Sequence, residues 1–141
     1  MPPASLMTER RPRSLPEVCA CGEQHGDLGG FFREFLDEFY IEQDATAREA
    51  MLADEPPLLE DFKRNAYFGA VAEHLARRYH LPIPKWTESR ERFLKKAWFP
   101  CGLESLKATY LVQSPTAFRR RMIFVEGDPL YRPRRDKPTL G

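Results

Sequence analysis

The stretch LLEDFKRNAYFGAVAEHLARRY, residues 58–79, decides the fold class of this chain. Its apolar residues recur about once per helical turn, which places them along one side of an α-helix. That side consists of Leu59, Phe62, Ala66, Ala70, Leu75 and Tyr79, with Val71 and His74 adjoining. The proline-rich segment 81–84 cannot continue a helix and ends it. We therefore expect a long amphipathic helix over residues 58–79 at the centre of a helical core.

Upstream, a second amphipathic pattern covers residues 31–40. Charged residues fill one face of this segment, and the other face is formed by Phe31, Phe32, Phe35, Leu36 and Phe39. Thr46 and Glu49 have the spacing of a capping box, so a short helix should begin at Thr46 and end by Asp54, ahead of two prolines. Residues 17–30 contain two cysteines and a glycine pair and are predicted to form a loop.

Downstream, Thr87 should cap a helix over about 88–96, and a further helix over about 103–112 should bury Leu103, Leu106, Tyr110 and Leu111. Ser114 and Pro115 are a serine cap followed by a proline at the first helical position, which starts a short helix through Arg120. Residues 122–125 should be extended. The predicted fold is therefore mainly α: a small bundle of about five helices with a short extended C-terminal segment.

The chain length of 141 residues suits one domain, which we assign to residues 17–130. Residues 1–16 hold four prolines and three arginines and are expected to be a disordered tail, and residues 131–141 a basic tail. No apolar run reaches the ~20 residues that a membrane helix needs, and the N-terminal arginines are not followed by the apolar stretch of a secretory signal. Together with an odd number of cysteines, three, this predicts a cytoplasmic protein that does not contact the membrane. Whether the chain starts at Met1 or Met7 stays open.

The charge of the chain is split along its length, although the net charge is only +1. Residues 17–62 hold thirteen acidic residues and two arginines, a net charge of −11. Residues 63–106 and 107–141 each carry a net charge of +5. The split fits docking of the acidic part on the basic part, a charged face for a partner, or ordinary solvation of helix surfaces.

One group of residues has the chemistry of a metal site: Cys19, Cys21 and His25. Thiolates and imidazoles are the preferred ligands of zinc, and Cys101 could complete the set. The C-x-C spacing differs from the usual C-x2-C of zinc sites, so the alternative is a pair of loop cysteines near an unrelated histidine. A small metalloprotein with this zinc site is one alternative function.

No enzymatic signature is present: the sequence lacks a phosphate-binding loop, a dinucleotide-binding glycine pattern and a G-x-S-x-G motif. A zinc deaminase would need a second cysteine after Cys101 and an H-x-E motif, and both are missing. We therefore predict that the protein is not an enzyme, and we assign no catalytic residue. Trp86 and Trp98 lie among apolar neighbours and are expected to anchor the core.

Six arginines lie in the C-terminal third of the chain: Arg119, Arg120, Arg121, Arg132, Arg134 and Arg135. Arginine binds phosphate in a bidentate manner, so these six residues could contact nucleic acid, with an affinity that falls steeply with salt. The alternative is that these arginines face a protein partner or the acidic part of the chain. A regulator that binds nucleic acid through these C-terminal arginines is therefore a second alternative function.

The segment from Trp98 to Val125 resembles a family of small, functionally uncharacterised helical proteins of bacteria. The resemblance lies in Trp98-Phe99-Pro100, in Leu106-Lys107-Ala108, and in the ending QSPTAFRRRMIFV, residues 113–125, which is similar to an ESPxxFRRRxIFV motif. Segments 72–76 and 82–87 are similar as well, so the likeness covers about residues 60–126. Gln113 and Met122 depart from the motif.

Proteins of this family are often regarded as antitoxin-like or regulatory partners of neighbouring toxin genes. The resemblance therefore implies a non-enzymatic regulator that binds a protein partner, with no cofactor. Ser114, Pro115 and Phe118 have a structural explanation of their own: the first two start a helix, and Phe118 fills the core. The oligomeric state is open at this point.

Overall fold

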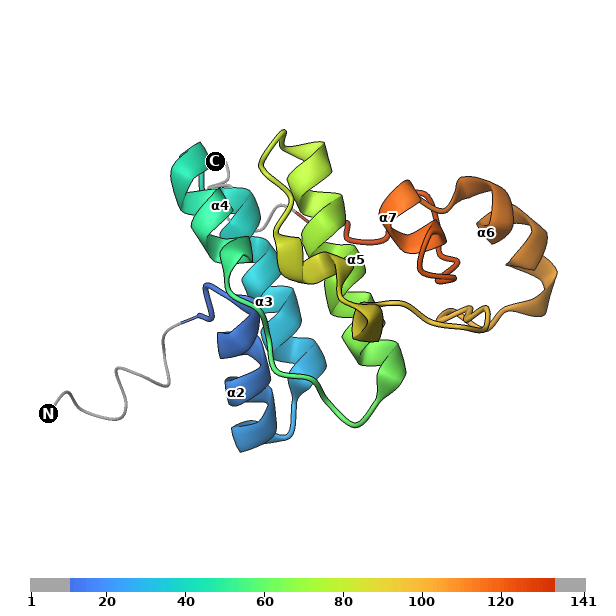
Figure 1. Cartoon of the computed structure of the whole chain (residues 1–141), viewed down its shortest axis with the longest axis horizontal. Coiled ribbons are helices and arrows are strands. Elements are labelled where there is room, and N and C mark those ends of the chain that lie inside the picture. The colour runs from blue at the N-terminus through green and yellow to red at the C-terminus, as the bar shows by residue number, and fades with distance from the viewer. Residues whose placement is uncertain (1–10, 134–141) are drawn as a thin grey trace, which may run out of the picture. The chain divides into compact units, whose positions relative to one another are not determined.

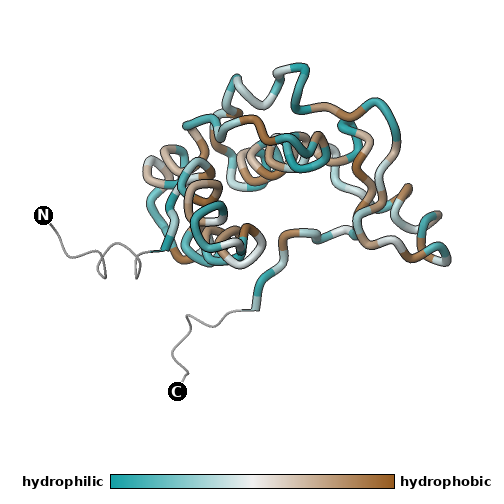
Figure 2. Tube along the Cα trace, turned by 90° about the horizontal axis from the view of Figure 1, so that it is seen from below, coloured by the Kyte–Doolittle hydropathy of each residue, from teal (hydrophilic) through white to brown (hydrophobic). Residues whose placement is uncertain are grey.

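The computed structural model describes residues 11–133, so Arg134, Arg135 and the outermost parts of both predicted tails lie outside the described residues. The predicted mainly helical fold is confirmed (Figure 1). The chain forms two compact units: unit 1 comprises the residues up to Pro56 and the segment from Arg132 onward, and unit 2 comprises Pro57–Tyr131. The helices of both units carry apolar and polar stretches, as amphipathic helices do (Figure 2).

Unit 1 begins with a helix that the sequence analysis missed, so the predicted loop over residues 17–30 is wrong. Helix α2 spans Leu15–His25, is capped by the Ser14 side chain, and ends at Gly26 in a left-handed conformation. Its buried face consists of Leu15, Val18, Cys19 and Gly22, which follow helical spacing. At Gly22 a side chain would lie 2.8 Å from the Leu28 backbone, so the glycine lets the next helix start directly against α2.

Helices α3 and α4 complete the helical part of unit 1. Helix α3 spans Leu28–Ile41 and buries Phe35, Leu36 and Phe39 of the predicted apolar face, whereas Phe31 and Phe32 are half-buried. Helix α4 spans Ala45–Ala53, but its cap is Asp44 rather than the predicted Thr46. The Arg48 guanidinium donates to the carbonyl oxygens of Phe39 and Tyr40 at 3.1 and 3.2 Å, which ties α4 to the end of α3.

Unit 2 is organised around α5, which spans Phe62–Arg78 and is capped by the Asp61 side chain. The helix therefore starts later than predicted, and Phe62 is 77% exposed rather than buried. The preceding segment is held by Asn65, whose side chain accepts from the Leu59 amide at 2.7 Å and donates to the Leu59 carbonyl at 2.9 Å. The buried face of α5 consists of small and apolar side chains around a single acidic one, Glu73.

The predicted helix over residues 88–96 is wrong. Two short 3-10 turns stand in its place, η1 over Lys85–Glu88 and η2 over Arg90–Arg92, separated by the extended residue Ser89. Thr87 is not a cap: it is buried, and its hydroxyl donates to the Pro84 carbonyl at 2.7 Å. The extended backbone at Ser89, with φ −62° and ψ 145°, ends the first turn, so the segment does not continue as a helix.

The rest of unit 2 consists of the 3-10 turn η3 over Glu104–Leu106, helix α6 over Lys107–Gln113 and helix α7 over Thr116–Arg119. The predicted extended segment pairs through an isolated parallel bridge between Trp98 and Ile123. In Figure 1, α7 lies between α5 and α6, and α6 lies at the far end of unit 2 from α5. None of the helices within residues 11–133 combines the length and the apolar character needed to span a bilayer.

Candidate functional site

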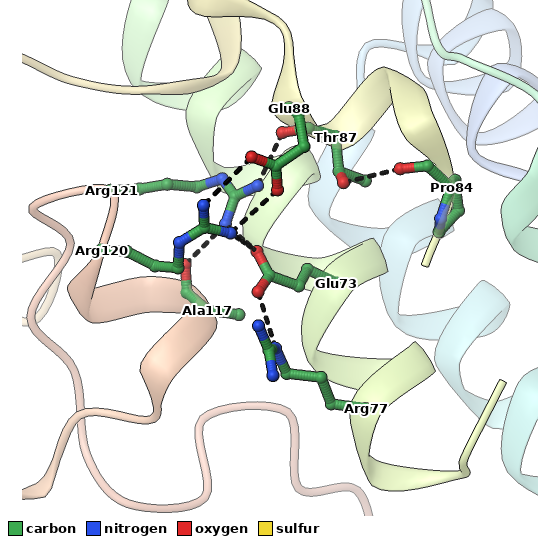
Figure 3. A network of polar contacts seen from close by, with 8 residues as sticks. All are labelled: Glu73, Arg77, Pro84, Thr87, Glu88, Ala117, Arg120 and Arg121. Atoms are coloured by element: carbon green, nitrogen blue, oxygen red, sulfur yellow. Dashed lines mark hydrogen bonds and ion pairs between the residues drawn. The ribbon is translucent and has the colours of Figure 1, made fainter. Parts of the chain in front are cut away.

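The centre of unit 2 is a buried acidic side chain held by three arginines (Figure 3). Glu73, on α5, is fully buried. Its Oε1 atom accepts from Arg121 Nη1 at 2.5 Å and from Arg120 Nη1 at 2.7 Å, and its Oε2 atom accepts from Arg77 Nε at 2.6 Å. We call Glu73, Arg77, Glu88, Arg120 and Arg121 the arginine cluster. Both carboxylate oxygens of Glu73 are thus occupied by guanidinium groups.

Arg121 is the innermost member of the arginine cluster and is itself fully buried. Besides Glu73, it donates to the Ala117 carbonyl at 2.8 Å and to the Thr87 carbonyl at 2.6 Å. Its guanidinium group lies 4.4 Å from the centre of the Phe93 ring, which is within the range of a cation–π contact. One side chain therefore joins α5, η1 and the segment after α7.

Arg120 extends the arginine cluster toward the surface. It makes a two-pronged pair with Glu88, through Nη1 to Oε2 at 2.9 Å and Nη2 to Oε1 at 3.0 Å. The hydrogen bond from Arg120 is the main reason why the pKa of Glu88 lies below its ordinary value. The same bond raises the pKa of Arg120. Both residues therefore stay charged at neutral pH.

The charge state of Glu73 results from opposing effects. Burial would raise the pKa of Glu73, but the hydrogen bonds from Arg121 and Arg77 outweigh it, and its pKa lies below the ordinary value. Glu73 is therefore ionised, and its charge is balanced within the cluster. A buried carboxylate is tolerated in a protein only when it is paired and hydrogen-bonded in this way.

Gly69 makes room for the arginine cluster on α5. A side chain at this position would place its Cβ 2.9 Å from Arg92 Cβ and 3.1 Å from Arg121 Nε. Arg92 is fully buried as well, donates to the Asn65 carbonyl at 3.3 Å, and lies 5.0 Å from the centre of the Trp86 ring. Two arginine side chains therefore cross α5 at a point where only glycine fits without displacement.

For Arg119, Arg120 and Arg121 the sequence left two alternatives open: contact with phosphates, or contact with a protein partner or the acidic part of the chain. Arg121 is inside the core and Arg120 is paired with Glu73 and Glu88, so neither presents an open guanidinium group to a phosphate. Arg119 and Arg120 are both exposed residues, and the Arg119 Nη2 atom donates to the Val112 carbonyl at 2.7 Å and to the Ser114 carbonyl at 3.1 Å.

Arg132, the next predicted contact residue, belongs to unit 1 and forms a two-pronged pair with Asp37, at 2.9 and 3.2 Å. Other acidic side chains of unit 1 are paired locally too: Arg13 donates to Glu38 at 3.0 Å and to Glu42 at 2.7 Å. Part of the charge split along the chain is therefore used for ion pairs inside each unit.

The residues predicted to be structural are placed as follows. Phe118 is fully buried, with ring centres of Tyr67 and His74 each 5.6 Å away. The buried Ser114 hydroxyl accepts from the Val125 amide at 2.8 Å and lies 2.6 Å from the Tyr110 carbonyl, so it joins two segments rather than capping α7. The residue at the cap position of α7 is Pro115. Trp86 is buried, whereas Trp98 is half-buried against Tyr67.

Cys19, Cys21 and His25 do not converge on one point. All three lie on α2, where residues two positions apart point to different sides of the helix. Cys19 is buried, Cys21 is half-buried and His25 is exposed, with its ring 5.4 Å from that of Phe31. Within residues 11–133, no group of three or more His, Cys, Asp and Glu side chains is placed to hold a metal ion.

The second notable feature of unit 2 is an exposed apolar surface on η3 and α6. The prediction that Leu103, Leu106 and Leu111 face inward is wrong: they are 54%, 38% and 49% exposed, and Val112 is 75% exposed. Of the predicted inward set, Tyr110 is the buried one. We call Leu103, Leu106, Leu111, Val112 and the exposed Ala108 the α6 surface. This exposure could not be predicted from the spacing of these residues, because apolar residues at helical spacing normally face a core.

Comparison with known proteins gives no family for this chain. It matches no family model, no curated protein and no solved structure.

Proposed function

We propose that this protein is a non-enzymatic regulator that acts by binding another protein chain through the α6 surface. The observation that carries the proposal is the exposure of Leu111 and Val112, which are consecutive residues of α6, together with that of Leu103 and Leu106 in the segment before it. Contiguous apolar patches on a protein surface mark interaction sites, whereas scattered single residues need no explanation.

The composition of the segment supports the same proposal. No charged residue occurs between Lys107 and Arg119. A solvent-facing helix normally carries charged side chains on its outer face. Burying one leucine or valine side chain against a partner stabilises a complex by about 1.5–3 kcal/mol, so a few such residues can sustain specific binding.

The contacts within the arginine cluster support a structural rather than a catalytic role for its charged side chains. Glu73 has both oxygens occupied by guanidinium groups, which is the arrangement of an internal ion cluster. Arg120 is already paired with Glu88 and Arg121 is buried, so their guanidinium groups are not open to phosphates. The described residues therefore favour a protein partner over the alternative of nucleic acid. The resemblance of residues 98–125 to antitoxin-like proteins suggests regulation as the class of activity. We assign this role to the cytoplasm, where an exposed thiol such as Cys101 stays reduced.

The test is binding to an identified partner, with the product of the adjacent gene as the first candidate. Wild-type chain, Val112→Glu and Phe62→Glu are compared by titration with the purified partner. Phe62 is a matched control, because it is an equally exposed apolar residue of unit 2 outside the α6 surface. The proposal expects Val112→Glu to weaken binding at least about tenfold, since a charge would be buried in the interface, and Phe62→Glu to leave it unchanged. Equal affinity of all three proteins would contradict it.

A further inference from the structure

We infer that His74 makes the packing of α7 on α5 sensitive to acid, because protonation of its ring weakens the contact between the two helices. His74 lies on α5 directly after Glu73, but it belongs neither to the arginine cluster nor to the α6 surface. Two features of the structure point to this role: the place of one ring nitrogen in the core, and the charges around it.

The Nε2 atom of His74 is enclosed in the core of unit 2. It is buried, and no atom within residues 11–133 is placed to form a hydrogen bond with it. The ring packs edge-to-face against that of Phe118 on α7, with 5.6 Å between the ring centres. Phe118 is itself fully buried, so the His74 ring lies against an apolar neighbour.

This site suits a neutral imidazole ring and opposes a charged one. In a neutral ring one nitrogen carries no proton, whereas an imidazolium carries an N–H donor on both nitrogens. Protonation would therefore place a charged N–H group at the buried Nε2 atom, which has no acceptor among the described residues. Burying an unpaired charge costs far more than burying an unpaired neutral group.

The charged groups around His74 do not remove this cost. On α5 they are Arg78, one turn away, and Glu73, whose two oxygens are already held by arginines. The segment after α7 contributes Asp128, which already accepts from Arg78 Nη1 at 3.2 Å. Burial is the main reason why the pKa of His74 lies below its ordinary value, Arg78 lowers this pKa further, and Asp128 and Glu73 offset only part of the effect.

The folded protein therefore binds a proton at His74 less readily than the unfolded chain does. The stability that depends on the neutral ring is complete above the ordinary pKa of 6.5, and it is lost as pH falls through the lower pKa of the folded protein. Because the ring packs on Phe118, its protonation favours states in which it leaves Phe118 for water, and these states separate α7 from α5. Glu73 acts at lower pH, below its ordinary pKa of 4.5, so the two effects can be distinguished.

The experiment is urea unfolding of the full chain at pH 7.5 and pH 5.0, followed by tryptophan fluorescence, with circular dichroism to confirm folding at both values. The variants are His74→Gln and His74→Phe, which both remove the titrating ring, so the test survives if one of them does not fold. The control is His80→Asn, which replaces an exposed histidine of unit 2 at φ 59° by a residue that tolerates this conformation. Between the two pH values, the unfolding constant of the wild type and of His80→Asn should rise at least about threefold more than that of either His74 variant.

A titration of the wild type followed by nuclear magnetic resonance locates the effect. The ring signals of His74 should titrate below pH 6.5, and the ring signals of Phe118 should shift with the same midpoint. The inference is overturned if the His74 variants and the wild type lose stability to the same extent, or if His80→Asn removes the pH dependence instead. It is also overturned if His74 titrates at or above pH 6.5, or if the Phe118 signals do not follow it.

Discussion

Glu73 and Arg121 are both fully buried, are 48 positions apart in the sequence, and meet at 2.5 Å between Oε1 and Nη1. The pair joins the middle of α5 to the segment that follows α7. Arg120 and Arg121 have no acidic residue beside them in the sequence. Their pairing with Glu73 explains how the segment that contains them packs against α5.

Replacing Arg121 with alanine should destabilise unit 2 by about 3 kcal/mol, because Glu73 would lose one of its buried partners and the Thr87 and Ala117 carbonyls would lose theirs. Tryptophan fluorescence in urea measures this directly, since Trp86 and Trp98, the two tryptophans of the chain, lie in unit 2. The control is Arg64→Ala, which removes an exposed 3.8 Å ion pair with Asp61 and should change stability by less than about 0.5 kcal/mol. Equal effects of the two substitutions would contradict the structural role of Arg121.

Replacing Glu73 with glutamine should change the way stability depends on pH. The folded-state pKa of Glu73 lies below its ordinary value of 4.5, so its contribution is present above that value and is lost as pH falls through the folded pKa. The wild type should therefore lose stability on acidification below about pH 4.5, and Glu73→Gln should lose less. Urea unfolding of both proteins between pH 7 and pH 3 tests this. A stability difference that stays constant over this range would show that Glu73 is not ionised in the folded protein.

Replacing Gly69 with alanine should destabilise unit 2 by about 1–3 kcal/mol, because the new Cβ would meet Arg92 Cβ at 2.9 Å. This is opposite in sign to the usual gain from replacing glycine by alanine within a helix. Gly29→Ala on α3 is the matched control, since its Cβ would meet the end of the Arg33 side chain at 3.5 Å, an ordinary contact. Thermal unfolding followed by circular dichroism should show a lower midpoint for the Gly69 variant and no decrease for the Gly29 variant.

The helices with a strong apolar face were predictable from the sequence. The phenylalanine pattern of residues 31–40 predicted α3, and the spacing of Ala66, Ala70 and Leu75 predicted α5. Helix α2 was missed because Cys19, Cys21 and the glycines around them are typical of loops. Its actual signals are the cap at Ser14 and the left-handed Gly26, which stand at the two ends of a helix-length segment.

The role of the arginines could not be predicted from local sequence. Whether Arg120 and Arg121 face solvent or the core depends on Glu73, which lies 47 and 48 positions away. One signal was present: Glu73 is the only acidic residue in the apolar run from Gly69 to Ala76, and a buried carboxylate requires a cationic partner. The exposure of Leu111 and Val112 had no such signal, because an apolar residue gives the same pattern whether its partner is its own core or another chain.

The central claim is that another chain covers the α6 surface, and hydrogen–deuterium exchange of the amides of α6 tests it most directly. Exchange is measured on the full chain alone and with the purified product of the adjacent gene, and α3 in unit 1 provides the internal reference. The account predicts slower exchange over α6 in the presence of the partner, with no change over α3, and loss of this protection in Val112→Glu. Exchange over α6 that the partner leaves unchanged, or protection that persists in Val112→Glu, would contradict the account.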